Sequence, residues 1–464
     1  MLNFQGNRSA NDVVVTGIGM VTPLGLSTTE TWQRLLCGDV AAARLKADDI
    51  DYWESLGRIP GLKRYGACLD QVRIAHALNT NVLLRQLSPQ RQSVVRSERV
   101  ISISLIALQE AIQQAGLTTQ FTKNPRTAIF FGSSKGGLRT AESLLQPSRS
   151  FARRALAGSV VDRSGPGAVF DQQTFADQQA AWEEQDPYGA RWSGVFTTDS
   201  ATNLMAELLG VTGPVICPVA ACATGLISVL QGATLIQSGA CDICITGSAD
   251  AALRASVLSS FHRLRVTSGH DEPTTACRPF DRDRDGFVIG EGAGVLILES
   301  RQHARMRGAR PLAQVLGGGW LGDSTGMTQM DETGEVVSEL LRRTTSTTGL
   351  TPQVLNVHGT GTPTNDLAES RGISRAGFSE LPVCYAVKGA LGHLLGAAGS
   401  VETALMLHGI HNRIHPGTTN LTTQDPDCRI PVAGSKCQVP ETTIWGKLSL
   451  GFGGHVAFGL FAPP

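Results

Sequence analysis

Cys222 is the residue whose neighbours best suit it to act as a nucleophile. It lies in the segment V-A-A-C-A-T-G, residues 219–225, after the apolar residues 215–219 and before the small-residue run 226–239. The first run predicts a strand and the second a helix, so we expect the thiol on a sharp strand-to-helix turn. Unpaired backbone N–H groups and the positive end of the helix dipole favour the thiolate there. The small flanking residues leave room for a substrate to approach.

The other nine cysteines are interpreted as small buried hydrophobic residues, which is the usual role of a free cysteine. Cys241 and Cys244 form a single C-x-x-C in an apolar run, residues 241–246, that predicts a buried strand. No second pair and no histidine at ligand spacing accompany them, so no metal site is predicted. Cysteines without a pattern fit a reduced cytoplasmic compartment better than a disulfide framework.

Two histidines share the small-residue surroundings of Cys222. His358 lies in V-H-G-T-G-T-P, and His393 lies in K-G-A-L-G-H-L-L-G-A-A-G. Taken singly, a histidine in an apolar segment is more often a hydrogen-bonded structural residue than a catalyst. Three glycine-rich segments that each offer one reactive side chain favour a single shared site.

The elements that must position these residues are short buried strands alternating with helices. Strands are expected at residues 13–15, 127–131, 241–246, 295–298, 354–357, 383–386 and 456–461, with a helix over residues 97–116. This alternation predicts an α/β protein with a mostly parallel, covered sheet. The turn after the first strand has Thr22 where a dinucleotide fingerprint needs its third glycine, and residues 132–137 lack phosphate-loop spacing, so neither nucleotide motif is complete.

Composition excludes several classes of protein. The chain has 464 residues, 41% of them hydrophobic, with 40 basic against 40 acidic side chains. This balance gives no electrostatic footprint for nucleic acid or for an anionic membrane. No apolar run reaches the length of a membrane span, and residues 1–11 lack the core of a signal peptide, so we expect a cytoplasmic protein.

Two further segments differ from their surroundings. Residues 139–193 are rich in Gln, Asp, Arg and Trp, which predicts a surface insertion of short helices and loops. Residues 279–286, P-F-D-R-D-R-D-G, are densely charged, although an apolar strand follows almost at once. Charge packed so close to a core predicts internal ion pairs, against the usual interpretation of such a run as a solvated loop.

Five ordered motifs together resemble the β-ketoacyl-acyl carrier protein synthases of the thiolase superfamily, of the dissociated type II kind. They are A-C-A-T-G, C-R-P-F-D-R-D-R-D-G-F-V-I-G-E-G-A-G, V-H-G-T-G-T-P-T-N-D-L-A-E, K-G-A-L-G-H-L-L-G-A-A-G and G-F-G-G-H. The likeness implies a thiolase-like fold of duplicated βαβαβαββ halves in an αβαβα layered arrangement. The halves would be residues 12–300, which carry the cysteine, and 301–464, which carry the two histidines, and the protein would be a homodimer.

The resemblance also implies a role for each matching residue. Cys222 would take an acyl group from a carrier-protein thioester, and His358 and His393 would bind the malonyl thioester and stabilise its enolate. Lys388 would organise the site through a carboxylate network that includes Glu369. The remaining roles are oxyanion-hole N–H groups from Cys222 and the gate residue Phe452, and hydrogen bonds to the phosphopantetheine arm from Thr360 and Thr362. The arm arrives on the acyl carrier protein, so no separate cofactor and no metal are implied.

Two departures from the family pattern bear on the substrate. The gating loop reads L-S-L-G-F-G-G, residues 448–454, where the family has N-S-F-G-F-G-G, so the usual loop hydrogen bonding and any cation nearby are in question. Lys135 stands where chain-elongating members have an apolar residue at the bottom of the acyl pocket. A desolvated ammonium beside an alkyl chain is costly, so either Lys135 reaches water or a partner subunit, or the acyl group is short, polar or acidic.

The sequence therefore predicts a decarboxylating condensation enzyme of fatty acid or specialised polyketide-like synthesis. A cysteine hydrolase would need one histidine oriented by an acid and open access for water, whereas two histidines and a lysine suit carbanion formation. Two alternatives stay open: a thiolase-fold acyltransferase acting on coenzyme A thioesters, and a non-catalytic chain-length partner in a heterodimeric synthase.

Overall fold

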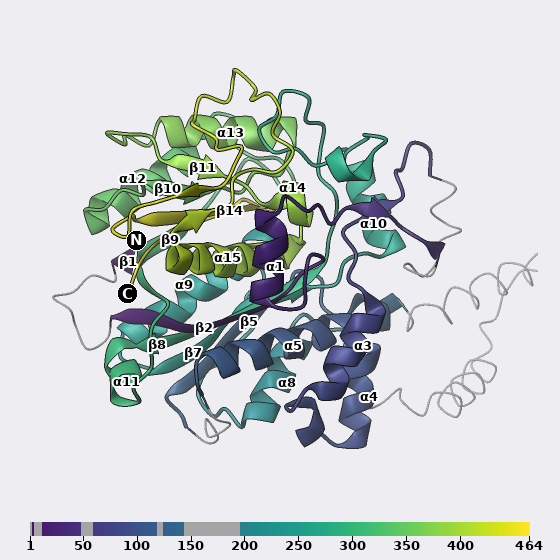
Figure 1. Cartoon of the computed structure of the whole chain (residues 1–464), viewed down its shortest axis with the longest axis vertical. Helices are drawn as coiled ribbons and strands as arrows, with labels where there is room; N and C mark the ends of the chain where they lie inside the picture. The colour runs from purple at the N-terminus through teal and green to yellow at the C-terminus, as the bar shows by residue number, and fades with distance from the viewer. Residues whose placement is uncertain (1, 4–11, 48–58, 118–123, 143–194) are drawn as a thin grey trace, which may run out of the picture.

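The strands of the main sheet lie on two levels, interleaved with three layers of helices (Figure 1). The computed structural model describes residues 2–3, 12–47, 59–117, 124–142 and 195–464. Helices α9 (Thr224–Gln237) and α15 (Ala398–Asn412) form the middle layer. The outer layers are α12 (Glu335–Thr348) with α13 (Pro363–Ser374) on one face and α5 (Arg99–Gln114) with α8 (Ser200–Leu209) on the other. The predicted αβαβα arrangement is confirmed.

The strands form one hydrogen-bonded path in the order β11-β10-β14-β15-β9-β2-β8-β7-β5-β6. The strands from β11 to β9 lie above the middle helices in Figure 1, and those from β2 to β6 lie below them. The path passes between the two levels through a short pairing of β2 with β9. The bounds are β2 Val13–Val21, β5 Thr127–Gly132, β6 Val215–Ile216, β7 Ile243–Asp250, β8 Gly292–Ser300, β9 Ala313–Gly322, β10 Val354–Asn356, β11 Val383–Tyr385, β14 Trp445–Gly451 and β15 His455–Ala462.

The same pairing pattern occurs on both levels. β5 runs parallel to β6 and β7, while β7 with β8 and β8 with β2 are antiparallel. On the other level β10 runs parallel to β11 and β14, while β14 with β15 and β15 with β9 are antiparallel. The expectation of a mostly parallel sheet was wrong, because strands buried on both faces read as the same apolar runs in either direction.

The middle helices are apolar around their circumference because each faces a sheet on two sides. They approach each other very closely at two glycines near their N-termini. A β-carbon on Gly225 would lie 2.2 Å from the backbone nitrogen of Ser400, and one on Gly399 would lie 2.5 Å from that of Leu226. Only glycine permits this approach, which brings the start of α9, and hence Cys222, against the start of α15.

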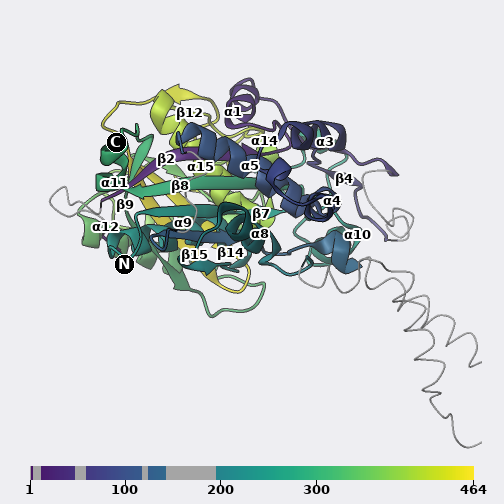
Figure 2. The ribbon, with the colours of Figure 1, turned by 90° about the horizontal axis from the view of Figure 1, so that it is seen from below.

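The remaining elements cover the outside of this core. Figure 2 shows the molecule from below, where α5 lies across β2 and β8, against which it packs. The predicted helix over residues 97–116 is therefore confirmed as α5, shorter by two residues at each end. The other bounds are β1 Leu2–Asn3, α1 Thr28–Leu36, β3 Ala43–Arg44, β4 Tyr65–Gly66, α3 Gln71–Thr80, α4 Pro89–Ser97, α10 Ala255–Arg263, α11 Arg301–Met306, α14 Lys388–Leu391, β12 Ile414–His415 and β13 Cys437–Gln438.

Of the predicted insertion, residues 139–193, only residues 139–142 lie within the described part of the chain. Among the described helices, none combines the length and the apolar character that crossing a bilayer requires.

Candidate active site

Cys222 lies in a short 3₁₀ turn, Ala221–Ala223, immediately before α9. Ala221 has a φ of 46°, a left-handed conformation that turns the chain sharply. The hydroxyl of Thr224 closes the turn by donating to the carbonyl of Ala221 across 2.7 Å. The predicted strand before it is reduced to Val215–Ile216. The turn holds the sulfur at the N-terminus of a helix, as predicted, with only 8% of the residue exposed.

The charge state of Cys222 differs from the expected thiolate. Burial raises the pKa of the Cys222 thiol to about 12, although the charges of Lys388 and Lys135 lower it. The resting sulfur is therefore a thiol at neutral pH. The helix terminus alone does not compensate for the loss of hydration in so closed a site.

His358 follows β10 in a loop held by hydrogen bonds from both sides of its backbone. The carboxylate of Glu369 accepts the backbone N–H groups of His358 and, at 2.8 Å, of Gly359. The ammonium of Lys388 donates to the carbonyl of His358 at 2.6 Å and lies 3.4 Å from its ring Nδ1. Because an ammonium can only donate, Nδ1 is the acceptor and the ring carries its proton on Nε2.

His393 follows α14 and is held by the backbone of Val288 and of Leu395. Its backbone N–H donates to the carbonyl of Val288 at 2.7 Å, and the backbone N–H of Leu395 donates to its ring Nδ1 at 3.3 Å. Leu395 adopts a φ of 51°, which turns the chain back toward the ring. The neutral ring of His393 therefore also carries its proton on Nε2.

The two imidazoles and the sulfur meet around one cavity. The ring centroids of His358 and His393 are 5.5 Å apart. Both residues line, together with Cys222, a cavity of about 680 Å³. One strand-to-helix turn and two loops far apart in sequence thus bring three predicted site residues together.

Both histidines are neutral at physiological pH. Burial, and then the charge of Lys388, holds the pKa of His358 and that of His393 well below the usual range. A neutral ring with its proton on Nε2 can donate one hydrogen bond to an oxygen in the cavity. Two such donors side by side form a suitable site for a developing oxyanion.

Lys388 is buried and forms an ion pair with Glu402, at 2.6 Å. The second oxygen of Glu402 accepts from another buried lysine, Lys447, at 2.7 Å. The sequence analysis did not identify Glu402 or Lys447 as site residues. The available signals were a lone acid in the small, apolar helix A-G-S-V-E-T-A-L-M and a lone lysine in the strand W-G-K-L-S-L-G.

Glu369 is not the direct partner of Lys388, whose ammonium pairs with Glu402. Glu369 accepts the backbone N–H groups of the loop that carries His358, and its charge interacts with that of Lys447. Burial raises the pKa of Glu369 to about 7, so its charge varies near neutral pH. The sequence did not identify Glu402, because it reaches Lys388 from the middle helix layer, which the sequence does not place.

Phe452 follows the last residue of β14 and lines the same cavity. Its ring stacks on Phe261 with centroids 6.2 Å apart and the planes inclined by 19°. The preceding residue, Gly451, packs directly on the cysteine turn: a β-carbon there would lie 3.1 Å from the backbone nitrogen of Cys222. The predicted gate and the nucleophile therefore belong to one packed unit.

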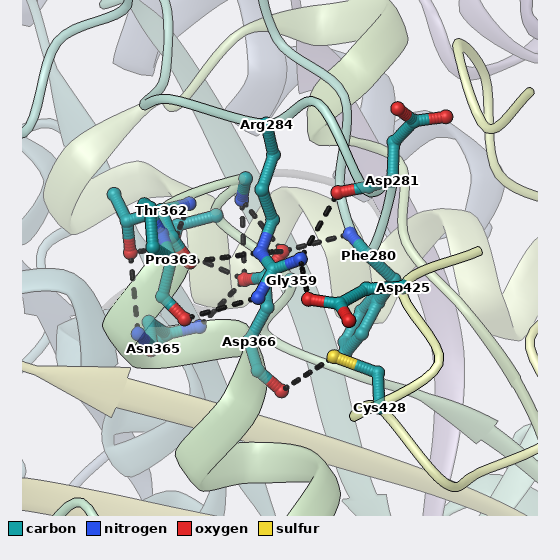
Figure 3. A network of polar contacts seen from close by, with 12 residues as sticks. Phe280, Asp281, Arg284, Gly359, Thr362, Pro363, Asn365, Asp366, Asp425 and Cys428 are labelled. Carbon is teal, nitrogen blue, oxygen red and sulfur yellow. Dashed lines mark hydrogen bonds and ion pairs between the residues drawn. The ribbon is translucent and has the colours of Figure 1, made fainter. Parts of the chain in front are cut away.

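Thr360 and Thr362 also line the cavity, and their hydroxyls are 2.9 Å apart. Their loop is anchored by the predicted internal ion pairs (Figure 3). Arg284 donates to the carboxylate of Asp425 at 2.6 Å and lies 3.7 Å from that of Asp366, which accepts the backbone N–H of Gly361. Arg284 thus braces this side of the site from within, and Asp281 is buried as well, whereas Arg282, Asp283 and Asp285 of the charged run are exposed.

Lys135 lies beside the cluster of aromatic rings near Cys222. Its turn is held by the buried carboxylate of Asp250, which accepts the backbone N–H of Lys135 at 3.1 Å and that of Gly396 at 2.7 Å. Its ammonium is 5.8 Å from the centroid of the Phe261 ring. No carboxylate pairs with this ammonium among the described residues.

No set of three or more metal-ligating side chains occurs in the described ranges. All ten cysteines are free. Cys241 and Cys244 are buried as expected, but Cys37 and Cys437 are exposed, so the interpretation of all nine other cysteines as buried was wrong for these two.

Comparison with known proteins now bears on the identity of this site. The model of the β-ketoacyl synthase N-terminal domain matches residues 10–304, and that of the C-terminal domain matches residues 312–422. The chain belongs to the β-ketoacyl synthase family. The predicted enzyme class, an acyltransferase of the 3-oxoacyl synthase type, is confirmed with it.

Relatives of this β-ketoacyl synthase match along nearly their whole length. It is 30% identical to a 3-oxoacyl-[acyl-carrier-protein] synthase 2 of Staphylococcus aureus, over 97% of each chain. It is 32% identical to a mitochondrial 3-oxoacyl-[acyl-carrier-protein] synthase of Arabidopsis thaliana, over 98% of this chain and 94% of the relative.

Solved structures agree on the fold. A β-ketoacyl synthase from Burkholderia phymatum superposes with a TM-score of 0.76 at 25% identity, over 98% of this chain and 99% of the other. A ketosynthase in complex with a type II polyketide acyl carrier protein gives the same TM-score at 24% identity and with the same coverage, which establishes the fold alone.

Proposed function

We propose that the enzyme joins an acyl group on Cys222 to malonyl-acyl carrier protein by decarboxylative Claisen condensation. The observation that carries this proposal is the convergence of the Cys222 sulfur and two neutral Nε2–H donors, from His358 and His393, on one cavity. Such a site supports an enolate without a strong base, since loss of CO₂ itself supplies the electron pair.

In the first step the thiol of Cys222 attacks an acyl thioester. A new C–S bond forms, the bond to the carrier's sulfur breaks, and the thiol proton leaves with the carrier's thiol. We assign the backbone N–H groups of Cys222 and Phe452 to the oxyanion of this step. The close packing of Gly451 on the cysteine turn supports this assignment.

In the second step the malonyl carboxylate leaves as CO₂, and its electron pair passes into the thioester as an enolate. The Nε2–H groups of His358 and His393 donate to the enolate oxygen. The enolate carbon then attacks the acyl group on Cys222, a C–C bond replaces the C–S bond, and the released thiolate takes a proton from water. The high pKa of Cys222, about 12, favours that proton uptake.

The other site residues have supporting roles in this proposal. Lys388 holds His358 from its carbonyl side, and Glu369 holds it from its N–H side. Thr360 and Thr362 line the cavity, where their hydroxyls can bind the amides of a phosphopantetheine arm. Since that arm arrives on the carrier protein, the enzyme needs neither a cofactor of its own nor a metal ion.

The acyl carrier protein is proposed as the partner because both named relatives are synthases of acyl-carrier-protein thioesters.

A homodimer is proposed as the assembly. In its support, the edge of the sheet at β6 presents exposed apolar side chains, with Ile216 46% and Val219 54% exposed. We place the enzyme in the cytoplasm, where ten free thiols persist. We also propose that the chain consists of two halves, residues 12–300 and 301–464.

We propose that Lys135 determines which acyl groups the enzyme accepts. An ammonium beside Phe261, near Cys222 and without a carboxylate partner in the described residues, disfavours a long alkyl chain. We therefore propose a short, polar or acidic acyl group, in fatty acid or specialised polyketide-like synthesis.

Two measurements separate this function from its alternatives. Intact-protein mass spectrometry after incubation with an acyl-carrier-protein thioester should show one acyl group, absent from Cys222→Ala. A non-catalytic chain-length partner would take up no acyl group. Release of CO₂ from malonyl-acyl carrier protein is expected as well, whereas a coenzyme A acyltransferase would release none.

A further inference from the structure

Glu402 is the centre of a buried charge cluster that the proposed steps use only in part. Its two oxygens accept from Lys388 and Lys447, and the exposed fractions of the three side chains are 3%, 1% and 0% in that order. Lys388 contacts His358 directly, so its place in the site is clear. Lys447 contacts neither the cavity nor a histidine ring, and its role must be sought in what it holds.

Lys447 lies inside the sheet, in the strand that leads to the gate. In the parallel pairing of β14 with β10 it stands opposite Asn356, two residues before His358. Its ammonium donates to the carbonyl of Leu448 at 2.8 Å and lies 3.5 Å from that of Val357. It therefore contacts the backbone of two segments: the one that leads to His358 and the one that leads to Phe452.

Three acceptors surround the ammonium of Lys447: a carboxylate oxygen of Glu402 and the backbone carbonyls of Val357 and Leu448. A buried acceptor without a donor costs about 1–3 kcal/mol, and more when it is charged. An ammonium suits this position, because it brings three donors and a positive charge.

We propose that Lys447 is a positioning residue for the condensation, holding Glu402 against Lys388 and fixing the segment that presents the His358 imidazole. The inference rests on the proposed function of the two imidazoles. It adds a second buried cation to the machinery of the enolate step and leaves the acyl-transfer step to Cys222 and its turn.

The proposal predicts a specific change in the pH dependence of CO₂ release, because the charge of Lys447 acts on the two histidines. The charged and titratable groups around Lys447 are Glu402, Lys388, Glu369, His358 and His393. Burial and the charge of Lys388 lower the pKa of both histidines most, and His393 also lowers that of His358. The positive charge of Lys447 lowers both pKa values further, so removing this charge raises both. Burial lowers the pKa of Lys447 itself to about 8, so the ammonium is present below that pH and is lost above it.

The test compares Lys447→Met, which removes donors and charge, with Lys447→Gln, which keeps a donor without charge, and Lys447→Arg, which keeps the charge. Two steps are measured between pH 5 and pH 9: acyl transfer to Cys222 and CO₂ release from malonyl-acyl carrier protein. We expect Lys447→Met to slow CO₂ release about 10- to 100-fold at neutral pH, the usual effect of losing a buried orienting partner, while acyl transfer changes little. The acid limb of CO₂ release should move to higher pH in both uncharged variants, and Lys447→Arg should restore it.

Thr127→Val is the control, because Thr127 lies in β5, on the other level of the sheet, and its buried hydroxyl has no partner in the described structure. Equal losses in both steps, with pH profiles unchanged from wild type, would overturn the proposal and leave Lys447 as a packing residue. If Lys447→Met does not fold, the comparison of Lys447→Gln with Lys447→Arg decides the question. A wild-type enzyme that takes up acyl groups but releases no CO₂ would instead contradict the proposed function itself.

Discussion

Leu395 donates its backbone N–H to Nδ1 of His393, and Lys388 offers its ammonium to Nδ1 of His358. Two unrelated donors thus impose the same tautomer on two facing rings. Each ring is left with an Nε2–H as its only donor to the cavity, which is what binding a single enolate oxygen requires.

The first prediction concerns these two donors. His358→Ala and His393→Ala should each lower CO₂ release from malonyl-acyl carrier protein about 100- to 1,000-fold, the range found on removing one oxyanion donor. Acyl transfer to Cys222, followed by mass spectrometry, should change far less because that oxyanion meets backbone N–H groups. Equal losses in both steps would place the imidazoles in acyl transfer as well.

The second prediction concerns the pH dependence of Cys222 reactivity. With a pKa of about 12, the thiolate fraction is small at neutral pH and rises with every step in pH. Alkylation of Cys222 by iodoacetamide, followed by peptide mass spectrometry, should accelerate about tenfold per pH unit between about pH 7 and pH 9. A rate that levels off near pH 7 would show that the helix terminus stabilises the thiolate after all.

The third prediction concerns Lys135. Wild-type enzyme should prefer a carboxyl-ended acyl thioester to a plain acyl thioester of the same length, and Lys135→Ile should reverse the preference by about tenfold, as expected for a partly desolvated charge pair. Competition between the two substrates for Cys222, read by mass spectrometry, measures this. Lys436→Ile, at an exposed lysine, is the control. An unchanged preference in Lys135→Ile would remove Lys135 from substrate selection.

The fourth prediction concerns the crossing of the middle helices. Gly225→Ala puts a methyl group 2.2 Å from the Ser400 backbone nitrogen, and neither helix can move without disturbing a sheet. The variant should lose about 1–3 kcal/mol of unfolding free energy, measured by denaturant unfolding. Gly322→Ala is the matched control, because a β-carbon there meets nothing within 4 Å. Equal stability of the two variants would show that the crossing can relax.

Much of the site could be predicted because its residue types occur in short, ordered motifs. The segments around Cys222, His358, Lys388 and His393 carry reactive side chains among glycines, and only close backbone approach explains so many small neighbours. The class of fold was equally accessible, since buried strands and helices differ in period and length.

Sequence alone therefore singled out Cys222, the two histidines and the α/β class, because each depends on local pattern, whereas the layered arrangement was expected from the family resemblance. Strand direction, the thiol state of Cys222 and the carboxylate that serves Lys388 depend instead on groups far apart in the chain. Lys388 and Lys447 come from a short helix and a strand that only folding brings to the carboxylate of Glu402, and the effect of these charges depends on their burial. Burial and contacts between distant residues are properties of the packed molecule. Only the tertiary structure therefore decided the strand directions, the thiol state of Cys222 and the carboxylate partner of Lys388.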